Sequence, residues 1–127
     1  MSIKRATIQP GPSLESSYEE LAASTGITGT LAQRMLPLLK VLSEVCNDIQ
    51  VWGLTSHTDL WLVASEDEYS PWLVQVSADL VRGYCVRYKM TASDVPWPDA
   101  FVEGKAQDEA TACKLILIAM KNSGGWY

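Results

Sequence analysis

The stretch "WGLTSHTDLW", residues 52–61, decides the fold, because it has the pattern of a β-hairpin. Bulky apolar side chains flank the run "TSHTD", whose residue types are typical of loops. If Leu54 pairs with Leu60, Trp52 shares one face of the hairpin with both leucines, and Trp61 lies on the opposite face. Both faces are then apolar, so we expect neither to be solvated in the ordinary way.

The same register places Gly53 opposite Trp61, which leaves room for the indole ring to lie across the glycine. It also leaves one apolar face uncovered if the helices gather on the other face. We expect that face to be covered by the proline-rich segment around Trp97, by the N-terminal arm, or by another protein.

Four segments rich in valine, tryptophan, tyrosine and leucine predict β-strands, with turn-forming residues between them. They are residues 49–55, 60–65, 72–77 and 81–90. Because the connections are short, we expect a four-stranded antiparallel meander. The two prolines of "TASDVPWPD", residues 91–99, argue against a regular central strand there.

Two helices are predicted before the hairpin, over residues 13–25 and 30–47, from the spacing of their apolar side chains. Gly26 is a natural stop for the first helix, and Thr30 is a natural start for the second. Pro37 lies inside the second pattern and should kink or split that helix, because its ring clashes with the preceding turn.

A third helix is predicted after the strands, beginning near Asp108 and Glu109, whose charges suit the positive end of a helix dipole. Its inner stripe is expected to contain Ala110, Cys113, Leu117 and Met120, with Ile116 beside it. The predicted fold class is therefore α+β: two N-terminal helices, a four-stranded antiparallel meander, and a C-terminal helix packed on the sheet. We expect a mobile N-terminal arm over residues 1–12 and a single domain over residues 13–127.

The charge distribution bears on the class of partner. The chain has ten basic and fifteen acidic residues, a net charge of −5. Residues 1–47 are neutral, so the excess negative charge lies in residues 48–127. Such a surface repels nucleic acid at long range and suits a cationic or neutral protein, or self-association.

The three cysteines, Cys46, Cys85 and Cys113, are far apart in sequence and have no metal-ligand spacing. Apolar neighbours surround each of them, which predicts three buried, reduced thiols and a reducing compartment such as the cytoplasm. No apolar run is long enough to span a membrane. We expect no metal and no cofactor.

The only histidine, His57, lies two residues from Asp59 and suggests one alternative function, a small enzyme. An aspartate can orient a histidine as a general base, with Cys46 or Cys85 as the nucleophile. An apolar environment, however, raises the pKa of a thiol, and histidine and aspartate are common in loops. We expect His57 to lie at a loop tip and assign no catalytic residue.

A second alternative comes from "ELAASTGITGTLAQRML", residues 20–36, which resembles a helix-turn-helix. The resemblance implies that Ile27 plugs the junction between the helices. It also implies a DNA-binding face made of Thr28, Thr30, Gln33 and Arg34. An ordinary corner between two helices is the preferred interpretation, because few basic residues lie there to neutralise phosphates.

The sequence favours a small, acidic, non-enzymatic protein-binding module, of which an immunity-type inhibitor of a toxin is one concrete form. The expected contact surface combines aromatic side chains with an acidic turn. It consists of Trp61, Tyr69, Trp72 and Trp97 with Glu66, Asp67 and Glu68.

Overall fold

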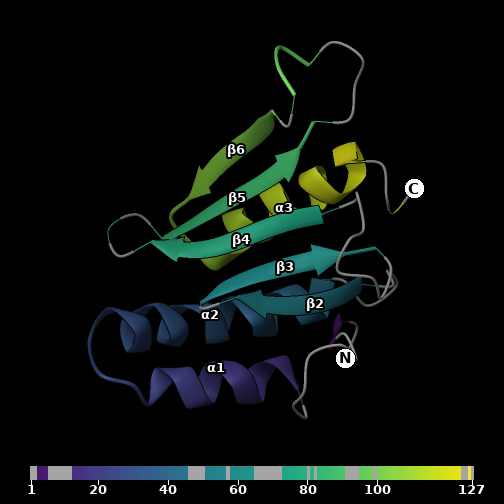
Figure 1. Cartoon of the computed structure of the whole chain (residues 1–127). Helices are drawn as coiled ribbons and strands as arrows, with labels where there is room; N and C mark the ends of the chain where they lie inside the picture. Colours follow the sequence, from purple (N-terminus) through teal and green to yellow (C-terminus); the bar gives the residue numbers. More distant parts are fainter. Residues whose placement is uncertain are drawn as a thin grey trace.

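Three helices and six strands make up the described part of the chain, and Figure 1 shows them in a computed structural model. The structure describes residues 3–5, 13–45, 51–56, 58–64, 73–79, 81, 83–90, 95–98, 100–123 and 126, with the backbone alone for 3–5 and 56. In chain order the elements are β1 (Ile3–Arg5), α1 (Leu14–Ala22), α2 (Gly26–Val45), β2 (Val51–Ser56), β3 (Asp59–Val63), β4 (Leu73–Asp79), β5 (Gly83–Lys89), β6 (Phe101–Ala106) and α3 (Glu109–Ser123). The chain has the α+β fold that its sequence predicts.

The six strands form one sheet, in the order in which they occur in the chain. Strands β2 to β6 are antiparallel neighbours, so the meander has five strands where we predicted four. β1 pairs in parallel with β2, although it belongs to the segment expected to be a mobile arm. β6 was missed because "FVEGKA" contains a glycine and two charged residues, which are weak strand formers.

All three helices pack on one face of the sheet, which we call the helix face; the opposite face is the open face (Figure 1). The main core lies between the helices and the sheet, and side chains from every helix and from β2 to β6 contribute to it. Its members include Tyr18, Met35, Leu42, Val51, Leu62, Val76, Val86, Ala106, Ile116 and Met120. This single apolar layer accounts for the placement of all three helices, because each has one apolar stripe to bury.

The register of the central hairpin differs from the predicted one by a single residue. Leu54 lies opposite Trp61, not Leu60, and only two residues separate β2 from β3. Because side chains alternate between faces, the shift puts Trp52 and Trp61 on the same face, the open one. Gly53 lies opposite Leu62, so the predicted packing of Trp61 across Gly53 is wrong. The prediction that both faces of the hairpin are apolar is confirmed.

A hydrogen bond from α1 fixes the hairpin turn. The hydroxyl of Tyr18, which is fully buried, donates to the carbonyl oxygen of Thr58 at 3.1 Å. Burial raises the pKa of Tyr18 well above its ordinary value, and the nearby Asp59 carboxylate raises it further. The neutral phenol thus ties the first helix to the turn, an interaction between residues 40 positions apart.

The boundaries of the first two helices differ from the predicted ones. α1 begins after Ser13, whose hydroxyl accepts a hydrogen bond from the Ser16 amide at 3.0 Å. α2 begins at Gly26, before the predicted start at Thr30. The Gln33 amide donates to the Ala22 carbonyl at 3.2 Å, and so caps the end of α1.

α2 continues through Pro37 as one helix, so the predicted split does not occur. Pro37 is exposed, on the side of α2 away from the core. Water can therefore serve the carbonyl group that the missing proline N–H leaves without its usual helical partner.

α3 begins after Asp108, whose carboxylate accepts a hydrogen bond from the Thr111 amide at 2.7 Å; this bond lowers the pKa of the Asp108 carboxyl. Its buried face comprises Ala112, Cys113, Ile116, Ala119, Met120 and Ser123. The predicted apolar stripe and the observed buried face differ by a rotation about the helix axis: Ala110 is exposed and Leu117 is only half-buried. Trp126 packs against the edge of the core.

Candidate interaction surface

The open face is divided into an apolar half and a charged half. The apolar half lies over β2, β3 and the start of β4, and consists of Trp52, Leu54, Trp61, Val63 and Leu73. The charged half lies over β4, β5 and β6, where the strand register aligns Gln75, Cys85, Arg87, Lys89, Glu103 and Lys105. A surface of this kind matches a partner that offers both apolar contacts and hydrogen-bonding groups.

The apolar half forms a second, smaller hydrophobic cluster on the side of the sheet opposite the helices. Leu54 and Val63 are buried, and the rings of Trp52 and Trp61 are half-buried around them. The indole nitrogen of Trp61 is buried and has no hydrogen-bond acceptor among the described residues. A buried indole N–H usually has an acceptor, and none of the residues that the structure describes supplies one to Trp61.

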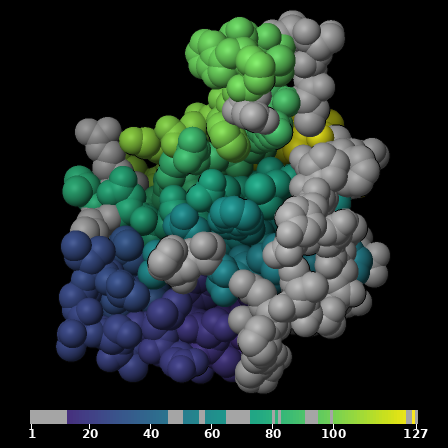
Figure 2. All heavy atoms as spheres, in the orientation of Figure 1, coloured from purple at the N-terminus to yellow at the C-terminus, as the bar shows by residue number. Residues whose placement is uncertain are grey.

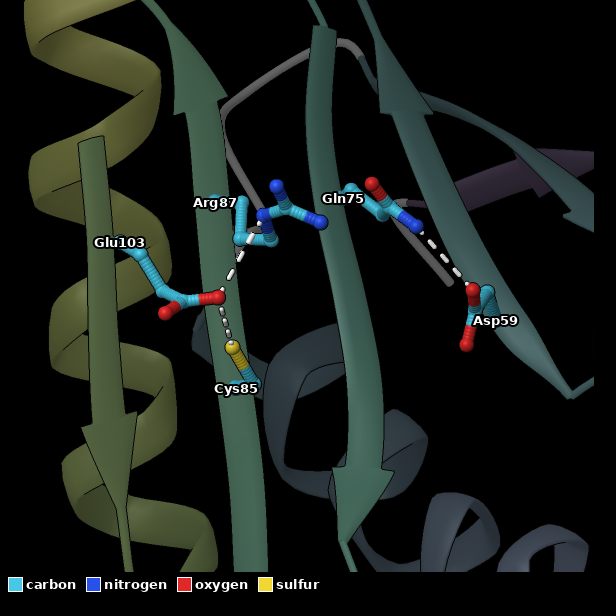
Figure 3. Close-up of polar contacts among 5 residues, drawn as sticks. All are labelled: Asp59, Gln75, Cys85, Arg87 and Glu103. Carbon is cyan, nitrogen blue, oxygen red and sulfur yellow. Dashed lines mark hydrogen bonds and ion pairs between the residues drawn. The ribbon is translucent and has the colours of Figure 1, made fainter. Parts of the chain in front are cut away.

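Three residues of the charged half meet at one carboxylate oxygen, as Figure 3 shows. The Cys85 thiol donates to Glu103 Oε1 at 3.1 Å, and Arg87 Nε lies 3.4 Å from the same oxygen. The Arg87 contact is an ion pair without hydrogen-bond geometry. The guanidinium carbon of Arg87 also lies 4.8 Å from the ring centre of Phe101, a cation–π contact.

Desolvation raises the pKa of the Cys85 thiol to about 11, with further contributions from its hydrogen bond to Glu103 and from the charge of that carboxylate. Cys85 is half-buried on the open face, so the prediction that it lies in an apolar core is wrong. Cys113 is buried in the core, as predicted. Cys46 lies outside the described residues.

A second polar contact on this face joins neighbouring strands: the Gln75 amide of β4 donates to the Asp59 carboxylate of β3 at 3.0 Å. The enzyme hypothesis paired Asp59 with His57, which lies outside the described residues. Figure 3 shows that Asp59 and Cys85 extend from different parts of the sheet and do not meet. Among the described residues, no group of histidine, cysteine and acidic side chains could hold a metal ion.

Trp97 lies in the loop between β5 and β6, beyond the ends of both strands. Its side chain is 66% exposed, and it stands between Pro96 and Pro98. In Figures 1 and 2 residues 95–98 lie beyond the end of the sheet. Trp97 therefore does not cover the apolar half of the open face, one of the roles that we considered for it.

Phe101, at the base of the same loop, is 49% exposed. Sequence reasoning missed this residue and Arg87, because their contact depends on the pairing of β5 with β6. One signal was present in the sequence: an aromatic residue follows closely after the proline-flanked tryptophan in "PWPDAF".

The structure places two of the predicted contact residues, Trp61 and Trp97, in different regions. Trp61 lies in the middle of the sheet and Trp97 beyond its end. The other five, Glu66, Asp67, Glu68, Tyr69 and Trp72, lie outside the described residues.

The helix-turn-helix residues lie on the first two helices, which run side by side in an antiparallel hairpin (Figure 1). Ile27 is 64% exposed and does not plug the junction. The Arg34 guanidinium donates to the Asp79 carbonyl of β4, and Gln33 is bonded to α1. These two side chains therefore hold neighbouring elements together, while Thr28 and Thr30 are exposed.

A pocket of about 510 Å³ opens beside Arg34, between α2, α3 and the turn from β4 to β5. Hydrogen bonds join three of its lining residues, Arg34, Tyr84 and Glu109. The Tyr84 hydroxyl lies 2.8 Å from the Arg34 carbonyl oxygen and 3.2 Å from Glu109 Oε1. Burial and the Glu109 carboxylate raise the pKa of Tyr84 above its ordinary value. We assign these groups to the anchoring of the helices on the sheet.

In the parts of the chain that the structure describes, no helix combines the length and the apolar character needed to cross a membrane. Comparisons of the chain with protein-family models, with curated proteins and with solved structures found no match.

Proposed function

We propose that this protein is a non-enzymatic protein-binding module whose principal anchor is Trp97. The observation that carries the proposal is the exposure of this ring, 66%, at a position beyond the end of the sheet. Tryptophan is among the residues that contribute most to binding free energy at protein interfaces, where its ring fills a pocket of the partner.

The two neighbouring prolines support this role. Pro98 restricts the backbone of Trp97 to extended conformations, and Pro96 has a fixed φ angle of its own. A loop that is already restricted loses less conformational entropy on binding, so more of the contact energy appears as affinity.

The neighbouring surface supplies further contacts of the kind found at interfaces. Phe101 and Arg87 form a stacked pair at the base of the loop, and both residue types are enriched at interfaces. Trp61, whose ring is half-buried, lies farther along the open face. A partner with an aromatic-binding pocket fits these features.

Two narrower proposals accompany this one. The net charge of −5 favours a neutral or basic partner, and an immunity-type inhibitor of a basic toxin is one such form. The described charged half of the open face carries lysine and arginine as well as glutamate, so negative charge there is not the basis of recognition.

The thiol of Cys85, which is in no disulfide, supports a reducing compartment such as the cytoplasm.

The test compares Trp97→Ala with Ile27→Ala, a substitution of another large exposed apolar residue far from the loop. The full chain is used as bait in an extract of its host, the retained protein is purified, and both variants are measured against it by titration calorimetry. Trp97→Ala is expected to weaken binding by roughly 30-fold, the effect of removing an interface anchor. Ile27→Ala should bind like the wild type.

Thermal unfolding provides the necessary control, because an exposed ring contributes little to stability. Trp97→Ala should unfold at the wild-type temperature, which separates a binding defect from a folding defect. Retention of the same partner with equal affinity by both variants would show that Trp97 is not the anchor. Purification of the chain without any retained protein would contradict the proposal itself.

A further inference from the structure

β6 is an edge strand of the described sheet. Among the strands that the structure describes it pairs with β5 alone, and Figure 1 shows it at the border of the sheet. An edge of this kind presents backbone donors and acceptors to any second strand of matching pattern. The strand is six residues long and contains no proline, so its whole length can pair.

The register shows which backbone groups point outward. The Met90 amide donates to the Ala100 carbonyl at 2.8 Å, and this pair continues the register that joins Lys89 with Phe101. In an antiparallel ladder, hydrogen-bonded pairs alternate with pairs that are not bonded. The even-numbered residues of β6 are thus bonded to β5. The N–H and C=O groups of Phe101, Glu103 and Lys105 point away from the sheet.

The side chains of this edge are complementary to themselves. Glu103 and Lys105 project from the open face on either side of Gly104. If two copies of β6 pair antiparallel with Gly104 at the centre, Glu103 of each copy lies directly opposite Lys105 of the other. The same register pairs outward-pointing residues with each other, so the backbone hydrogen bonds also form. Centring on Glu103 or on Lys105 would instead place like charges opposite each other, which is unfavourable.

Gly104 suits the centre of such a pair. Its non-hydrogen-bonded position brings two Cα atoms to about 4.5 Å, the closest approach in an antiparallel sheet, and glycine has no side chain to oppose it. On the helix face, Val102 and Ile118 are 37% and 53% exposed beside this edge. They line an apolar pocket of about 260 Å³ next to Gly104, and a second copy would cover it.

We propose that the protein forms a symmetric dimer through β6, with Gly104 opposite Gly104 and two reciprocal Glu103–Lys105 pairs. The sheet then continues from one copy into the other. The proposal is independent of the role of Trp97, because the outward groups of β6 lie along the side of the sheet and Trp97 lies beyond its end.

The test measures mass in solution by sedimentation equilibrium over a wide range of protein concentrations. The wild type should approach twice the 14.0 kDa of one chain, with weaker association at high salt. Lys105→Glu places Glu opposite Glu twice in each dimer and should raise the dissociation constant at least about tenfold. Lys40→Glu makes the same charge change on the exposed side of α2 and should leave association unchanged.

Lys105→Pro provides a second, uncharged test. Its N–H points outward, so proline removes a donor from the dimer without removing a hydrogen bond to β5, and circular dichroism should remain that of the wild type. Dissociation of this variant would support the proposal. A wild type that stays monomeric throughout, or a dimer that tolerates either Lys105 substitution, would overturn it.

Discussion

Glu103 joins the side chains of neighbouring strands in the charged half of the open face. One of its carboxylate oxygens accepts the Cys85 thiol and pairs with Arg87, which in turn stacks on Phe101. Because Arg87 and Glu103 are both partly exposed, the ion pair adds little to the free energy of folding. Its effect is on orientation: the carboxylate holds the guanidinium over the aromatic ring.

Burial and the same carboxylate both suppress ionisation of the Cys85 thiol, and the contribution of the carboxylate can be measured. With a pKa raised to about 11, the thiol is almost fully protonated at pH 8 and should react slowly with iodoacetamide. The rate should increase as the pH rises toward 11. Glu103→Gln removes the negative charge that disfavours the thiolate, so alkylation at pH 8 should accelerate by roughly threefold or more. Mass spectrometry of the peptide that contains Cys85 gives the rate.

Glu44→Gln, an exposed change on α2, is the matched control and should leave the rate unchanged. If Glu103→Gln also leaves it unchanged, the contact between Glu103 and Cys85 does not govern the thiol. Rapid alkylation of the wild type at pH 8 would revive the hypothesis of a cysteine nucleophile, because it would mean a low thiol pKa. The same pKa shift determines how stability depends on pH. The free energy of unfolding should fall as the pH rises from 9 toward 11, because the thiol ionises at a lower pH in the unfolded chain than in the folded chain.

At the scale of elements, the junction of α1 and α2 depends on two glycines for different reasons. Gly26 has a φ angle of 79°, which other residues adopt only with strain, but a β-carbon there would meet no atom within 4 Å. Gly29 is buried inside the first turn of α2, and a β-carbon there would lie 1.9 Å from the Ser24 carbonyl oxygen. The first glycine is needed for its backbone angle and the second for its lack of volume.

This difference predicts unequal effects of the same substitution. Gly26→Ala should cost about 1 kcal/mol of unfolding free energy, the strain of a left-handed alanine. Gly29→Ala should cost more, roughly 3 kcal/mol, because the helix hairpin must open to admit the methyl group, despite the better helix propensity of alanine. Urea denaturation of both variants provides the comparison. A Gly29→Ala variant as stable as the wild type would show that the two helices do not pack this closely.

The elements also show where sequence reasoning succeeds and where it fails. The apolar periodicity identified three helices and four strands, because each has a stripe or alternation that reports one buried face. The periodicity did not determine the hairpin register, because both faces of the hairpin are apolar whether Leu54 pairs with Leu60 or with Trp61. The bond from Tyr18 to Thr58, which fixes the turn, joins distant parts of the chain and has no local signature.

The candidate surface was less predictable than the fold. Trp97 was predicted from the sequence as a contact residue, and the proline-rich segment around it was also considered as a cover for the second apolar face of the hairpin. Phe101, Arg87 and Glu103 were missed, because they come together only when β6 pairs with β5. Predicting a site whose residues come from neighbouring strands requires the order of those strands. That order could not be predicted, because the sequence of β6 has only a weak strand pattern.

At the scale of the whole molecule, β1 pairs in parallel with β2, and Ile3 lies beside Val51. The chain segment between these two strands is longer than that between any other neighbouring strands of the described sheet. Such long-range contacts cost the most loop entropy and commonly form late in folding. Removing residues 1–5 should therefore change the refolding rate by less than about twofold and speed unfolding by roughly threefold or more. Stopped-flow fluorescence of the tryptophans measures both rates. A large loss of refolding rate would place β1 in the folding nucleus instead.

α3 has a consequence for the synthesis of the protein. It follows the entire sheet in the chain, and it covers the helix face of β4, β5 and β6 with Ile116 and Met120. Each hairpin of the meander can close as it leaves the ribosome, since each strand pairs with the one made just before it. The helix face of β5 and β6 has no cover from a described helix until residues 109–123 emerge, whereas α1 and α2 already lie against β2 and β4. During that interval the nascent sheet exposes an apolar surface, and a chaperone that binds nascent chains at the ribosome exit would have its greatest effect there.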